Sequence, residues 1–155
     1  MRTRKTPLLK WVAMIELVIG AYNLMTGLMS AYVLIIDLDG VMASFAESGL
    51  EYTAGLLGAS VAITSIVGLI MTLAGAVGMI FSSIPGKQKF PIYCGYGLFV
   101  FVILSDIIQI VFMGSGVALT MLFPFVIHGL YLWGAMKNKK ELEAAGVLEE
   151  PDDEI

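Results

Sequence analysis

A few polar residues interrupt the apolar stretches of this 155-residue chain, and their side chains are the ones that could do chemistry. They are Glu16, Asn23, Asp106, Gln109 and His128. Carboxyl and imidazole groups can carry protons, and amides can form hydrogen bonds between helices. Ionisable groups at membrane depth are costly unless they find partners. The sequence leaves two interpretations of these residues open: a structural polar cluster, or a route that handles protons.

Asp106 is the most unusual of these residues because it lies deep inside an apolar stretch. Folding the last two apolar stretches into a hairpin places Asp106 opposite Pro124, whose ring leaves the carbonyl of Thr120 free. Gln109 lies at the height needed to donate to that carbonyl. Asp106 is then either protonated or paired with His128, one turn deeper. We expect a structural cluster rather than a proton-handling pair.

One face of the first apolar stretch carries its strongly polar residues together with its glycines. Glu16, Gly20, Asn23, Gly27 and Ser30 fall within about 80° of arc at the helical period. The second stretch has a matching face, with Gly68, Thr72 and Gly75 on it. Small residues let helices approach closely in lipid. These two faces predict a packing seam, with hydrogen bonds from Asn23 and Thr72 and with Glu16 in reach of water or Lys10.

The composition explains why these residues are expected inside a membrane. The chain is 58% hydrophobic and 14% charged, with a mean hydropathy of +0.88, whereas soluble domains are about 45–50% apolar and about 25% charged. Four stretches are long enough to cross a bilayer as helices: 11–36, 54–81, 92–113 and 117–136. The predicted fold is an all-α integral membrane four-helix bundle over residues 1–136. A charged tail follows over 137–155, helical until about Gly146.

The charges divide between the two ends of these predicted helices. All nine Lys and Arg residues fall on one side of the four-helix arrangement, and four acids occupy the loop of residues 37–53 on the other. Short loops rich in Lys and Arg stay in the cytoplasm. We therefore expect both termini on the cytoplasmic side of a cell membrane. The long acidic loop also predicts a short surface helix within it.

Two functions are consistent with these features. The first is a non-catalytic membrane protein that binds or stabilises a membrane-protein partner or assembles with itself, in contact with membrane lipids. The second is a small oligomeric proton-coupled transporter or channel that uses the intramembrane polar residues. In having a carboxylate, Glu16, in the first of four helices, the chain resembles the small multidrug transporters, which use a carboxylate at that place to couple transport to protons. The resemblance is limited to that residue and the helix count, because those proteins are shorter and lack the acidic loop and tail.

The sequence offers little for other chemistry. One His and one Cys are too few for a zinc site, which needs three or four ligands. The glycines lie in apolar stretches rather than in phosphate-binding loops. We expect no metal, no cofactor, no nucleic acid and no catalysis, and a membrane-embedded enzyme acting on lipid or quinone is the weakest of the three classes.

Overall fold

The structure, a computed structural model, describes residues 7–49, 52–84, 86–113, 122–144 and 146. In this part of the chain all regular structure is helical, with no strand. The helices are α1 (Pro7–Ile36), α2 (Leu38–Glu47), α3 (Ala54–Phe81), α4 (Lys89–Met113) and α5 (Leu122–Ala144). The described part of the chain is therefore all-α, as predicted.

Three of the helices, α1, α3 and α4, are long and apolar enough to cross a membrane. This property indicates a membrane protein. The fourth predicted span, 117–136, begins among residues 114–121, which lie outside the described residues. Its described part belongs to α5, which continues into the charged segment Lys137–Glu143.

Local sequence signals account for where the helices begin and end. Pro7 opens α1, at a position where its missing N–H costs nothing. Asp37 caps α2, its carboxylate accepting from the backbone N–H of Gly40 at 3.0 Å. Thr53 caps α3 in the same way, its hydroxyl oxygen accepting from Leu56 N at 3.2 Å. The two acids at positions 37 and 39 thus mark a helix start, and the acidic loop contains the expected short helix.

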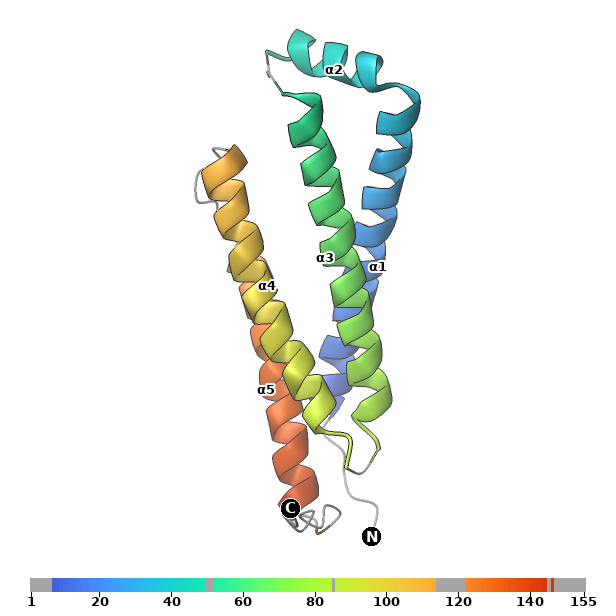
Figure 1. Ribbon diagram of the computed structural model, residues 1–155. Coiled ribbons are helices and arrows are strands. Elements are labelled where there is room, and N and C mark those ends of the chain that lie inside the picture. Colours follow the sequence, from blue (N-terminus) through green and yellow to red (C-terminus); the bar gives the residue numbers. More distant parts are fainter. Residues whose placement is uncertain (1–6, 50–51, 85, 114–121, 145, 147–155) are drawn as a thin grey trace, which may run out of the picture.

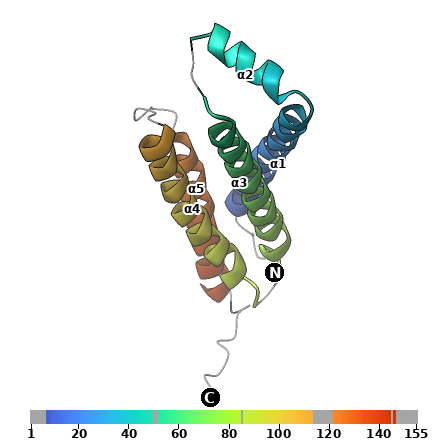
Figure 2. The same cartoon turned by 45° about the horizontal axis from the view of Figure 1, so that its top comes forward.

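The long helices are arranged as two antiparallel pairs, α1 with α3 and α4 with α5 (Figure 1). Helix α2 lies across the end of the first pair, and the pairs diverge toward that end (Figures 1 and 2). The start of α1 and the end of α5 lie together at the opposite end (Figure 1). The described lysines consequently gather at that end, and the acids of α2 lie at the other.

Helices α1 and α3 approach closely because glycines on each face the other. A Cβ added to Gly20 would overlap the backbone of Met71 and Thr72, and one added to Gly27 would overlap Ser65. Glycines of α3 make the reciprocal contacts: Gly68 lies against Leu24, and Gly75 against Leu17. Backbone contact of this kind maximises van der Waals packing in an apolar solvent.

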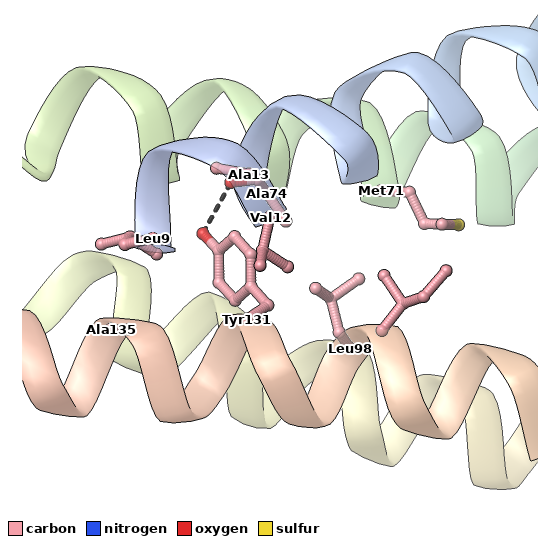
Figure 3. Close-up of a cluster of buried hydrophobic side chains, with 9 residues drawn as sticks. Leu9, Val12, Ala13, Met71, Ala74, Leu98, Tyr131 and Ala135 are labelled. Atoms are coloured by element: carbon pink, nitrogen blue, oxygen red, sulfur yellow. Dashed lines mark hydrogen bonds between the residues drawn. The ribbon is translucent and has the colours of Figure 1, made fainter. Parts of the chain in front are cut away.

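The second pair joins the first through contacts of α4 with α3 and of α5 with α1. Tyr131 is fully buried and donates its hydroxyl hydrogen to the carbonyl of Ala74 in α3, at 2.7 Å (Figure 3). Gly78 makes room for this ring, because a Cβ there would lie 2.8 Å from the tyrosine oxygen. Leu9, Val12 and Ala135 complete the cluster around it (Figure 3). The core therefore lies near the end where α1 begins.

Candidate functional site

A carboxyl–imidazole pair links the two helix pairs. Glu16 of α1 and His128 of α5 are 112 residues apart in sequence, and Oε1 of Glu16 lies 2.6 Å from Nδ1 of His128. Glu16 is 0% exposed and His128 is 3% exposed. Either the imidazole N–H donates to a carboxylate or a protonated carboxyl donates to the ring nitrogen. In both cases one proton is held between the two groups.

The second oxygen of Glu16, Oε2, is buried and has no hydrogen-bond partner within the described residues. Burying a polar atom without a partner destabilises the fold. Among the described residues the pair therefore has an incomplete set of hydrogen bonds, and a functional role or a bound water or ion would explain it.

A cavity of about 270 Å³ lies between the two helix pairs. It begins at the level of His128, one of its lining residues, and extends away from the packed core around Tyr131. The lining residues come from α1, α3, α4 and α5. The Glu16–His128 pair thus stands at the boundary between the packed end of the protein and the cavity.

The cavity combines an apolar wall with several polar groups. Aliphatic side chains from all four helices and the rings of Phe101 and Phe123 form most of its surface. The polar lining residues are Asn23, Thr64, Ser105, Asp106 and His128. Apolar cavities that hold a few convergent polar groups are typical of binding sites.

The structure pairs the predicted polar residues differently from the sequence-based expectation. Of the two alternatives for Asp106, protonation or a pair with His128, the pair is not observed, because the imidazole Nδ1 contacts Glu16 instead. Asp106 lines the same cavity, and no hydrogen bond or ion pair joins it to another described residue. The expectation that Lys10 or water reaches Glu16 is also wrong, because Glu16 is fully buried and Lys10 is exposed. The group that reaches Glu16 is His128 of α5.

The packing seam between α1 and α3 contains the predicted small residues, but its hydrogen bonds differ from those expected. The hydroxyl of Thr72 donates to Gly68 O of its own helix at 2.7 Å rather than to α1. Asn23 reaches across the seam, and its amide donates to Met71 Sδ at 3.9 Å. The expected contact between Gln109 and Thr120 lies outside the described residues, since neither side chain is described.

Two residues that position α5 against α3 were not predicted from the sequence. Tyr131 reads as an ordinary aromatic residue of an apolar stretch, and Asn138 sits among lysines that suggest a solvated surface. Asn138 is instead buried and donates to the carbonyl of Ser82 at the end of α3, 3.0 Å away. Together they fix α5 against α3 and so hold His128 at the height of Glu16.

Comparison with protein families, curated proteins and solved structures found no match for this chain. Within the described residues, no three His, Cys, Asp or Glu side chains are grouped so that they could hold a metal ion. The functional argument therefore rests on the cavity and on the pair beside it.

Proposed function

We propose that this is a non-catalytic multi-pass membrane protein that receives a membrane-embedded partner at the cavity between its two helix pairs. The partner is another membrane protein or a second copy of this chain. The observation that carries the proposal is the cavity itself, about 270 Å³ lined by both helix pairs. An occupant would contact all four long helices and so stabilise one arrangement of the two pairs.

The proposed topology has four crossings, with α5 and the preceding residues forming the last. Both ends of the chain then lie in the cytoplasm, and α2 lies on the outer face of the cell membrane. The gathering of lysines at one end of the helix pairs supports this orientation.

Site-specific photocrosslinking in cells tests the proposed function. A benzophenone amino acid replaces Phe101, which lines the cavity, and in a second variant replaces its neighbour Val100, which is 59% exposed on the same helix. The two positions lie at nearly the same depth, so they differ mainly in facing the cavity or the lipid. We expect a discrete protein adduct from position 101 and not from position 100. Equal adducts from both positions, or none from position 101, would contradict the proposal.

A second candidate is a small oligomeric proton-coupled transporter. The specific observation in its favour is the Glu16–His128 pair beside a cavity that also contains Asp106. A transport route must meet water on each side of the membrane in turn. Single cysteines at Asn23 and Thr64, with Cys94 replaced by Ser, test this with a small hydrophilic thiol reagent. Labelling from both sides favours transport, and protection from one or both sides favours the binding function.

A further inference from the structure

Asp106 is an acid without a counter-charge in a largely apolar cavity. It lines the cavity between the helix pairs, and no ion pair joins it to another described residue. Carboxylates at membrane depth normally pair with a cation or a hydrogen-bond donor. The imidazole of His128 lines the same cavity, but its Nδ1 contacts Glu16.

The parts of the helices that line the cavity contain no lysine or arginine. None of the chain's Lys or Arg residues lies within residues 11–86 or 90–136, which include every residue that lines the cavity. Two acids, Glu16 and Asp106, therefore share the interior with one imidazole. If His128 carries a proton for Glu16, that pair is neutral, and the cavity still has one acid more than it has bases.

The remaining lining residues suit an organic cation. Phe101 and Phe123 line the cavity, and aromatic rings can attract cations over their faces. The amide oxygen of Asn23 and the hydroxyl oxygen of Thr64 can accept further hydrogen bonds from an ammonium group. At about 30 Å³ for each water molecule, the volume of about 270 Å³ accepts a small aromatic or branched aliphatic group.

We propose that the cavity binds an ammonium group carried on an apolar stem, with the Asp106 carboxylate as its counter-ion. This inference rests on the proposed function, because it names the chemistry of what the cavity receives. The ammonium group belongs either to a free amphipathic amine or to a lysine of the membrane-embedded partner.

Binding of 2-phenylethylammonium to the full-length protein in lipid nanodiscs tests the inference. The neutral analogue 2-phenylethanol, which has the same shape without the charge, is the ligand control. The variants are Asp106→Asn, Asp106→Glu and Asp39→Asn, the last removing an exposed acid of α2 far from the cavity. We expect Asp106→Asn to weaken binding of the amine about tenfold or more, because a charge-assisted contact is lost. Asp106→Glu should restore most of the affinity, and Asp39→Asn should leave it unchanged.

Circular dichroism of each variant first establishes that it folds. An amine affinity that is equal in wild type and Asp106→Asn, or no stronger than that of 2-phenylethanol, would overturn the inference. So would an equal loss in Asp39→Asn, which would indicate attraction to any acid. If the amine does not bind but position 101 still gives a protein adduct, the inference is wrong and the proposed function is retained. Asp106-dependent amine binding without that adduct assigns the ligand to a free amine and rejects the protein partner.

Discussion

Replacing Glu16 and His128, singly and together, measures how strongly the pair joins the helix pairs. Both residues become leucine, which has a similar volume and no polar atoms. In His128→Leu the fully buried carboxyl of Glu16 loses its described partner, and removing one partner of a buried pair costs about 3–5 kcal/mol. Protonation of the carboxyl reduces this loss, so we expect the lower end of that range.

Glu16→Leu leaves an imidazole buried without its acceptor, which costs about 1–3 kcal/mol. In the double variant neither polar group remains to be satisfied, and replacing a whole buried pair by apolar residues is often close to neutral. We therefore expect the double variant to be more stable than His128→Leu alone. The sum of the two single losses should therefore exceed the loss in the double variant by about 3 kcal/mol or more, at the top of the range for residues in contact.

The assay is equilibrium unfolding by sodium dodecyl sulfate in mixed micelles, followed by circular dichroism. A control cycle combines Glu16→Leu with Ile66→Ala, which alters a lipid-facing side chain of α3 that is 49% exposed. Those two changes should add within about 0.5 kcal/mol. Additive losses in the Glu16–His128 cycle would refute the reasoning, because they would mean that the two side chains do not stabilise each other.

Three further predictions concern packing and topology. Gly20→Leu and Gly27→Leu should each destabilise the protein in detergent by about 1–3 kcal/mol, because the added side chain would overlap α3. Gly58→Leu, in open space on α3, should have little effect on thermal unfolding, and equal effects at all three positions would argue against a close seam. Tyr131→Phe should lower the free energy of unfolding by about 0.5–1.5 kcal/mol through loss of the hydrogen bond to Ala74 O. The control Tyr22→Phe, at a residue 69% exposed, should leave the free energy of unfolding unchanged, and equal values for the two variants would mean that the hydrogen bond does not stabilise the fold. In a Cys94→Ser background, a membrane-impermeant thiol reagent should label Ser44→Cys but not Ile84→Cys from outside the cell, and the reverse pattern would invert the proposed orientation.

The fold class could be predicted from the sequence because it follows from local properties. Long apolar runs without charge favour helices that lie in a bilayer, wherever the rest of the chain is. The second predicted stretch and α3 have the same bounds, Ala54–Phe81, because Thr53 marks the start and the polar turn follows the end. Likewise, glycines at helical spacing placed Gly20 and Gly27 on one face before their contacts with α3 were known.

The sequence alone could not determine which polar groups meet. His128 and Asp106 belong to neighbouring helices, so a pair between them was one of the two alternatives that the sequence left open for Asp106. The actual partner, Glu16, lies 112 residues away, and only the packing of α5 against α1 and α3 brings it there. That packing depends on contacts such as Tyr131 with Ala74 and Asn138 with Ser82. The energies of these contacts depend on how closely the helices approach and how their surfaces fit, which local hydrophobicity does not encode. The same packing leaves Asp106 in the lining of the cavity.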